Sequence, residues 1–151
     1  MKAEVINPFL ESARTVIEQV IQVSPSTGSL GIKEIELIDN HIWIQVGITG
    51  EMKGNIIFGF AEPVALRMVS IMMGGFVITE MDEMGKSAIS ELGNMISGNA
   101  SAILYNQGVT VDISPPQIMK RESMSFMPLK ALSVPLLMDG VGEMHIQVMI
   151  S

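Results

Sequence analysis

The 151-residue chain contains no cysteine, which excludes disulfide bonds and thiolate metal sites. It also lacks an excess of basic residues, because its formal net charge is −7. An acidic chain gains nothing from counterion release on nucleic acid and is repelled by anionic membrane surfaces. The composition therefore argues against a nucleic-acid-binding protein, and the absence of cysteine suits a reducing compartment.

The sequence has no apolar run long enough for a membrane span, although 48% of its residues are hydrophobic and 14 are methionine. The longest uncharged stretch, residues 92–111, contains Asn, Ser and Gln side chains and three glycines. The first residues are interrupted by Pro8 and lack the basic region and apolar run of a signal peptide. We therefore expect a soluble cytoplasmic protein with an adaptable, methionine-rich core, folded as a single domain over residues 1–151.

Hydrophobic periodicity divides the first half of the chain into a helix, a set of strands and a second helix. Apolar residues three and four apart predict an amphipathic helix over residues 4–22, with Pro8 in its first turn. Alternation then predicts a meander of three strands, over 34–37, 42–48 and 56–60. Glu62-Pro63 predicts a helix start, and Gly74-Gly75 predicts its end.

The second half predicts one long helix followed by strands. Thr79-x-x-Asp82 resembles a capping box, which predicts a helix from Glu80 to about Asn106. Alternating residues then predict strands over 109–113, 132–138 and 144–150, with Pro135 at an edge or bulge. The expected fold is α/β of the α+β type. It is a mostly antiparallel sheet of meander and hairpin strands, covered on one face by three helices, with the site on the longest.

That long helix has two chemically distinct sides when its residues are placed 100° apart. An apolar side is predicted to pack on the sheet, and it gathers Ala88, Ile89, Leu92, Met95, Ile96, Ala100 and Ile103. Ser87, Glu91, Asn94 and Gly98 fall on the other side, where spacings of three and four make them neighbours. From spacing alone this polar stripe is either a working surface or an ordinary solvated face.

Three glycines in the helix also need a reason, since each costs about 1 kcal/mol relative to alanine. Gly98 lies on the polar stripe, so it predicts close approach by another backbone there. Gly85 and Gly93 are explained equally well by tight packing within the fold.

A carboxylate and a carboxamide side by side can assist a reaction that takes place on a partner protein. A carboxamide both donates and accepts hydrogen bonds, so Asn94 can hold a water molecule in line with a phosphorus atom. Glu91 on the same face can pair with a partner's lysine. Neither group is a good nucleophile here, so the electrophile and its metal would come from another molecule.

These residues resemble the signature of the CheC/CheX/FliY family of chemotaxis phosphatases. The pattern is an acidic residue, then Ser-Ala-Ile, then Glu-x-x-Asn, a small residue and Gly, and it covers residues 82–98. Further segments along the chain are similar to CheX landmarks: Asn7-Pro8-Phe9-Leu10-Glu11, Gly47-Ile48-Thr49-Gly50, Met72-Met73-Gly74-Gly75 and Val111-Asp112-Ile113-Ser114-Pro115-Pro116.

The resemblance implies a phosphatase that acts on the phospho-aspartate of a CheY-like response regulator. It assigns water orientation to Asn94 and contact with the regulator's lysine to Glu91. Ser87 and Gly98 are expected in the partner-binding surface because they share the polar stripe. The resemblance implies that the chain itself binds no cofactor, because Mg²⁺ belongs to the regulator. It also implies a homodimer that joins sheets edge to edge.

One departure separates the chain from CheC-type members, which carry the helix motif twice. A second copy could only be Glu4-x-x-Asn7, and Pro8 follows at once, so Asn7 is expected at a helix cap or in its first turn. One motif per chain fits CheX better than CheC. It leaves open a non-catalytic receiver-binding or scaffold module, or a dimeric structural domain without a receiver partner.

Other candidate residues receive structural interpretations. His41 and His145 have no spaced carboxylate and are expected on the sheet surface rather than at a metal. Asp82 and Glu83 are expected at the start of the helix, where their negative charges interact favourably with the helix dipole. Trp43 is expected in the core or at an interface. Ser87 and Ser90 are expected to lack a His or Lys base, which argues against a serine nucleophile, although Lys86 precedes Ser87 directly.

Overall fold

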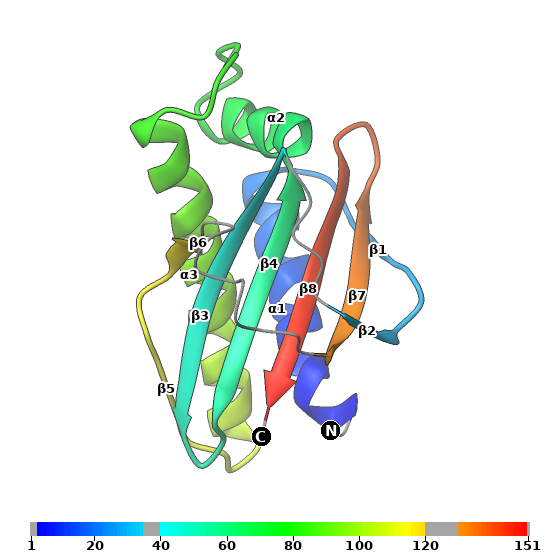
Figure 1. Cartoon of the computed structure of the whole chain (residues 1–151), viewed down its shortest axis with the longest axis vertical. Coiled ribbons are helices and arrows are strands. Elements are labelled where there is room, and N and C mark those ends of the chain that lie inside the picture. Colours follow the sequence, from blue (N-terminus) through cyan, green and yellow to red (C-terminus); the bar gives the residue numbers. More distant parts are fainter. Residues whose placement is uncertain (1–2, 35–39, 120–129, 151) are drawn as a thin grey trace.

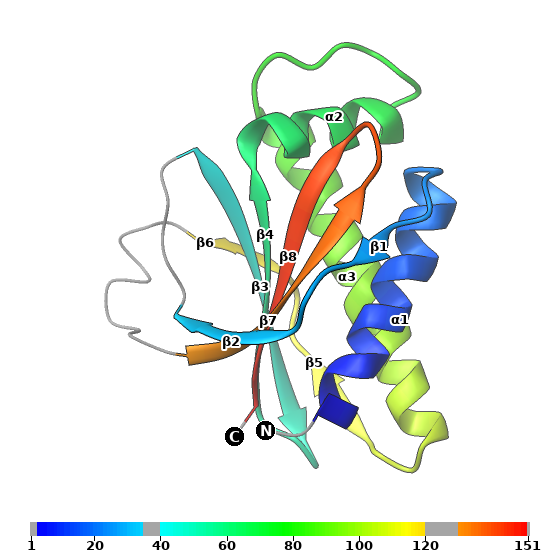
Figure 2. The ribbon, with the colours of Figure 1, turned by 90° about the vertical axis from the view of Figure 1, so that its right-hand side faces the viewer.

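The computed structural model describes residues 3–34, 40–119 and 130–150, in which three helices cover one face of an antiparallel sheet (Figures 1 and 2). In chain order the elements are α1 (Ala3–Val20), β1 (Ser26–Thr27), β2 (Gly31–Glu34), β3 (His41–Gly50), β4 (Gly54–Ala61), α2 (Glu62–Met72), α3 (Glu83–Asn106), β5 (Val111–Ile113), β6 (Gln117–Met119), β7 (Lys130–Met138) and β8 (Gly142–Ile150). The predicted fold class is confirmed, and α3 is the longest helix. None of the described helices is long and apolar enough to span a membrane.

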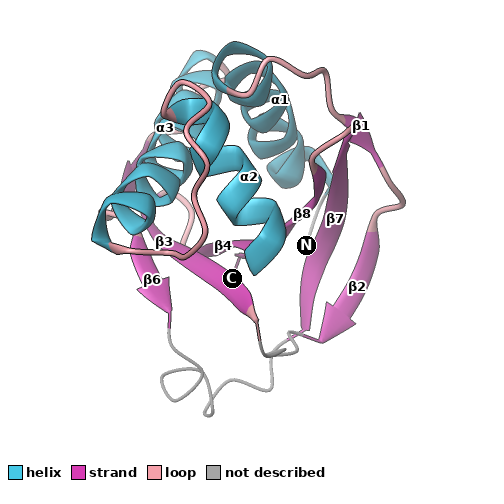
Figure 3. Cartoon of the chain, turned by 90° about the horizontal axis from the view of Figure 1, so that it is seen from above, coloured by secondary structure: helices cyan, strands magenta, loops and turns pink. Residues whose placement is uncertain are grey.

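Two hairpins form the centre of the sheet. The strands β3 and β4 make one hairpin, β7 and β8 make the other, and β4 pairs with β8 to join them. Short strands complete the two sides, β1 and β2 beside β7, and β5 and β6 beside β3. Seen from above, α1 and α3 lie side by side over the sheet, and α2 lies over one end (Figure 3).

The first strand predicted for the meander, over residues 34–37, lies outside the described residues except for Glu34. The strand that ends at Glu34, β2, pairs with β7, on the far side of the sheet from β3. Alternation shows that a segment is extended but carries no information about its neighbour, and the partner of β2 lies about 100 residues away along the chain.

The edge position expected for Pro135 is wrong, because β7 has β8 on one side and the short strands β1 and β2 on the other. Pro135 instead lies opposite the break between β1 and β2. The Pro135 carbonyl accepts a hydrogen bond from Gly28 N–H, at 2.8 Å, on the side that faces β1 and β2. The nitrogen of the same residue points to that side too, so its missing proton costs the pairing with β8 nothing.

The start of α1 differs from the prediction. Pro8 is buried inside the helix, which begins at Ala3, so Asn7 lies beyond the first turn and is exposed. A proline this early removes a single hydrogen-bond donor, and burial of the apolar face offsets that loss.

The start of α3 also differs, because Asp82 and not Thr79 is its N-cap. Asp82 has an extended backbone, and its carboxylate accepts a 2.8 Å hydrogen bond from Gly85 N–H. The predicted start at Glu80 was therefore wrong by one turn. Asp is at least as good a cap as Thr, and the residues before Asp82 are not helical.

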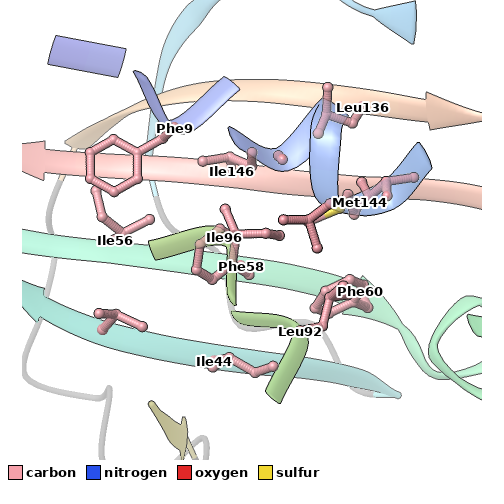
Figure 4. Close-up of a cluster of buried hydrophobic side chains, with 14 of the residues drawn as sticks. Phe9, Ile44, Ile56, Phe58, Phe60, Leu92, Ile96, Leu136, Met144 and Ile146 are labelled. Carbon is pink, nitrogen blue, oxygen red and sulfur yellow. The ribbon is translucent and has the colours of Figure 1, made fainter. Parts of the chain in front are cut away.

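The core lies between the sheet and the helices (Figure 4). Alternate residues of β3, β4 and β8 point toward the helices, and α1 and α3 place their apolar sides against them. Fully buried members include Phe9, Ile44, Phe58, Leu92 and Ile96. This packing fixes how α3 is rotated, and so fixes which of its residues face away from the sheet.

Trp43 is buried on the opposite face of the sheet, in a small cluster with Ile57, and its ring stacks on His41. Gly59 makes room for it, since a Cβ there would lie 2.3 Å from the tryptophan ring. The His145 ring lies on that face as well, with Nε2 3.7 Å from a Glu143 carboxylate oxygen. The two histidines are thus sheet residues, as expected.

Candidate functional site

The polar stripe predicted on the long helix is present on α3. Glu91 and Asn94 are exposed, as are Ser87 and Gly98, while Leu92 between them is fully buried. Residues three apart on a helix place their Cβ atoms about 5–6 Å apart, so the carboxylate and the carboxamide are neighbours.

The buried side of α3 approaches the sheet closely because Gly93 has no side chain. A Cβ at this position would lie 3.3 Å from Ile44 Cγ2 and 3.6 Å from the Phe58 ring. Gly85 is similarly confined, with a Cβ expected 2.7 Å from Met81 Sδ. The interpretation that Gly85 and Gly93 allow tight packing within the fold is therefore confirmed.

Gly98 differs, because a Cβ there would meet nothing within 4 Å among the described residues. The close approach predicted at Gly98 is therefore not made by the backbone that the structure describes. A partner's approach stays a prediction.

A groove of about 750 Å³ runs along the exposed side of α3. The helix supplies one wall of this α3 groove, and the segment around β5 and β6 supplies the other. That segment runs beside α3 (Figure 1). The groove brings Ser87, Glu91 and Asn94 together, whereas Gly98 lies outside it. Its lining residues are Glu83, Lys86, Ser87, Ser90, Glu91, Asn94, Ile113, Pro115, Pro116 and Ile118.

The second wall was missed by sequence reasoning, which read Pro115-Pro116 only as a strand end and a family landmark. Its position depends on a close contact with β3. Gly47 N–H donates to Ser114 Oγ at 2.7 Å, and Ser114 N–H donates to the Gly47 carbonyl at 2.9 Å. A Cβ at Gly47 would lie 3.1 Å from Ser114 Oγ, so glycine permits this attachment. The two prolines then hold the segment rigidly beside the helix.

The groove is mildly acidic. Glu83 and Glu91 contribute two carboxylates, and Lys86 contributes one ammonium group. Lys86 Nζ lies 3.6 Å from Glu83 Oε1, an exposed pair whose stabilising contribution is small. Lys86 and Ser90 were also missed, although Ser90 lies four residues before Asn94 and so shares its side of the helix.

Neither the Glu91 carboxylate nor the Asn94 carboxamide makes a side-chain hydrogen bond or ion pair within the described part of the chain. Both are therefore available to a molecule that enters the groove. No three His, Asp or Glu residues gather around a possible metal position in residues 3–34, 40–119 and 130–150. The arrangement suits contact with a partner that brings its own reactive group.

Comparison with known proteins gives matches over almost the whole chain. The family model described as "Chemotaxis phosphatase CheX" matches residues 42–144. A curated protein of Thermotoga maritima, "CheY-P phosphatase CheX", is 32% identical over 152 residues, which cover 98% of this chain and 97% of the relative.

Solved structures agree with this match. The chain is similar to the crystal structure of the CheX-CheY-BeF3-Mg+2 complex from Borrelia burgdorferi, with 25% identity, a TM-score of 0.82 and 99% coverage of each chain. It shares its fold with chemotaxis protein CheX from Vibrio vulnificus, with 22% identity, a TM-score of 0.84, and coverage of 99% of this chain and 100% of that one.

Proposed function

The chain belongs to the CheX family of chemotaxis phosphatases, and from this we propose that it hydrolyses the phospho-aspartate of a CheY-like receiver domain in the cytoplasm. The Thermotoga relative is named for activity on CheY-P, and the Borrelia relative was crystallised with CheY. The observation that carries the proposal is the pair Glu91 and Asn94, exposed side by side in an open groove on a rigid helix.

In the proposed reaction α3 enters the receiver's active site with these two side chains leading. The Asn94 carboxamide orients a water molecule in line with phosphorus, because it can donate one hydrogen bond and accept another. Water oxygen forms a bond to phosphorus while the bond to the aspartate oxygen breaks. The products are inorganic phosphate and a free carboxylate, and the water proton leaves with the phosphate or to solvent.

Glu91 has a positioning part in this proposal. Its carboxylate pairs with the lysine of the receiver site, which fixes how the two proteins dock. Mg²⁺ would belong to the receiver, where it neutralises charge on the phosphoryl oxygens. Ser87 would contact the same partner beside Glu91, and Gly98 would allow the partner's backbone to come near the helix.

A phosphate-release time course tests this function. A phosphorylated CheY-type receiver with Mg²⁺ should lose phosphate at least tenfold faster when the chain is added in catalytic amounts. A non-catalytic scaffold would bind the receiver without changing that rate, and a purely structural domain would not bind it. Either of those results would reject phosphatase activity.

We also propose a homodimer formed through sheet edges. The outer side of β2 is the better edge by its chemistry, since Ile32 there is 71% exposed and Leu30 beside it is 47% exposed. Light scattering at micromolar concentration should give twice the 16.4 kDa chain mass. A monomer mass would contradict the proposal, and Ile32→Asp should lower the mass if β2 is the edge.

A further inference from the structure

The segment between β5 and β6 contains one residue more than the part of β3 that it faces. β5 ends at Ile113, opposite Ile48, and β6 begins at Gln117, opposite Gln45. Residues 114–116 therefore stand opposite only two residues of β3, as in a β-bulge. Two of the three are prolines, which cannot donate to a ladder and are found at bulges for that reason. The bulge takes this short segment out of the sheet and places it in the wall of the α3 groove.

Two pairs of hydrogen bonds fix the segment to β3 and to the turn that follows β3. One is the pair between Gly47 and Ser114. In the other, Glu51 N–H donates to the Thr110 carbonyl at 3.1 Å, and Thr110 N–H donates to the Glu51 carboxylate. The Ser114 hydroxyl also lies 3.5 Å from the Pro115 carbonyl oxygen. The segment is thus attached both before β5 and at the bulge, so its position does not depend on a partner.

The two walls of the α3 groove differ in chemistry. The helix wall presents charged and polar side chains, including Glu91 and Asn94. The opposite wall presents only apolar side chains, and we call it the proline wall: Ile113, Pro115, Pro116 and Ile118. Pro115 is exposed and the other three are half-buried. Exposed apolar surface that borders polar residues is typical of a site where another molecule binds.

The centre of the proline wall offers no free N–H group. Pro115 and Pro116 have none, and Ser114 N–H is bonded to the Gly47 carbonyl. Phosphoryl oxygens accept hydrogen bonds, so they gain nothing from a wall that presents carbonyl oxygens and apolar rings. A phosphoryl group in the groove is therefore directed to the helix wall, where Asn94 lies. The proline wall is left to an apolar part of the partner.

We propose that the proline wall docks an apolar side chain of the receiver, next to its phospho-aspartate, while Glu91 and Asn94 meet the reacting groups. The proposal rests on the proposed function, because it places the same receiver in the same groove. The continuity of the wall with Glu91 and Asn94 in one groove favours this occupant, and so does the wall's lack of donors. Ser114 is then a positioning residue, since it holds the wall in place without touching the receiver.

Calorimetric titration with a beryllofluoride-activated CheY-type receiver and Mg²⁺ measures docking, because this phosphoryl mimic is not turned over. Pro115→Asp should weaken binding by about tenfold or more, since an unpaired carboxylate is costly to bury in an interface. The conservative variant Pro115→Val keeps an apolar side chain, so its affinity should stay within about threefold of wild type. Pro63→Asp makes the acidic exchange at an exposed proline outside the α3 groove and should bind as wild type.

Wild-type affinity in Pro115→Asp would overturn the proposal. A loss of equal size in Pro115→Val would also overturn it, because the ring and not its apolar character would then matter. The same loss in Pro63→Asp would show that added charge anywhere on the chain weakens binding, and would likewise count against the wall.

Ser114 is tested by two variants that differ in one hydroxyl group. Ser114→Ala leaves Gly47 N–H without its acceptor and should weaken receiver binding by about fivefold or more, because the wall is no longer held. Ser114→Thr keeps the hydroxyl and should restore the affinity. A merely structural role would lower the urea midpoint of Ser114→Ala while the folded protein kept wild-type affinity, and that result would reject Ser114 as a positioning residue.

Phosphate release from the same proteins distinguishes this inference from the proposed function. Pro115→Asp should raise KM by about tenfold or more with little change in kcat, because Glu91 and Asn94 are intact. Hydrolysis by the wild-type chain together with a wild-type KM in Pro115→Asp would refute the proline wall alone. Absence of hydrolysis by the wild-type chain would refute the proposed function, whereas the binding difference between Pro115→Asp and Pro115→Val would still decide the role of the wall.

Discussion

Replacing Asn94 by alanine should lower the turnover of phosphorylated receiver by about a hundredfold or more, without unfolding the chain. Loss of one preorganised polar group in a reaction of this kind raises the barrier by about 2.7–4 kcal/mol, and each 1.36 kcal/mol is a factor of ten. The measurement is the release of inorganic phosphate at saturating receiver, which reports kcat. Asn94 is exposed and caps nothing in α3, so the free energy of unfolding should change by no more than about 0.5 kcal/mol.

The chain offers a matched control in Asn99, an exposed asparagine on the same helix that does not line the α3 groove. Asn99→Ala removes the same chemical group and should keep the wild-type rate. If Asn94→Ala kept full activity, or if Asn99→Ala lost as much, the role assigned to Asn94 would be wrong. A change confined to KM would instead mean that Asn94 helps binding and does not orient water.

Replacing Phe58 by alanine should destabilise the chain by about 3–5 kcal/mol, the usual cost of removing a buried aromatic side chain. Phe58 is fully buried at the centre of β4, opposite Ile146 of β8, and its ring lies under Gly93 of α3. The cavity left behind would separate the helix that carries the site from the sheet that holds it. Urea denaturation should show a lower midpoint with an unchanged slope.

Phe76 provides the control for that experiment, because it is 74% exposed in the link between α2 and α3. Phe76→Ala deletes the same ring but leaves no cavity, so its free energy of unfolding should stay within about 0.5 kcal/mol of wild type. Equal losses in both variants would contradict the position of Phe58 in the core.

The two exposed polar residues of the site stand on a helix that is packed firmly against the sheet. Leu92 and Gly93, between the two polar residues, are buried against the sheet, so any rotation of α3 would break core contacts. The backbone positions of Glu91 and Asn94 are therefore fixed by the core, although their exposed side chains make no hydrogen bond in the described part of the chain. A docking partner would then have to order two side chains and not the segment that carries them.

The sequence by itself determined the elements whose signals are local. Helical periodicity placed Glu91 and Asn94 on one exposed side of α3, because a 3.6-residue repeat depends only on residues a few positions apart. Alternation located both hairpins for the same reason. The ends of elements were less accurate, since Thr79 and Asp82 are both good caps and only the fold selects between them.

Tertiary structure decided which distant segments meet. The partner of β2 and the wall of the α3 groove at Pro115 both join residues that are far apart in the chain. The polar pair on α3 could be read from the sequence because it depends on one helix, whereas its groove became visible only once the sheet had brought Ser114 beside Gly47.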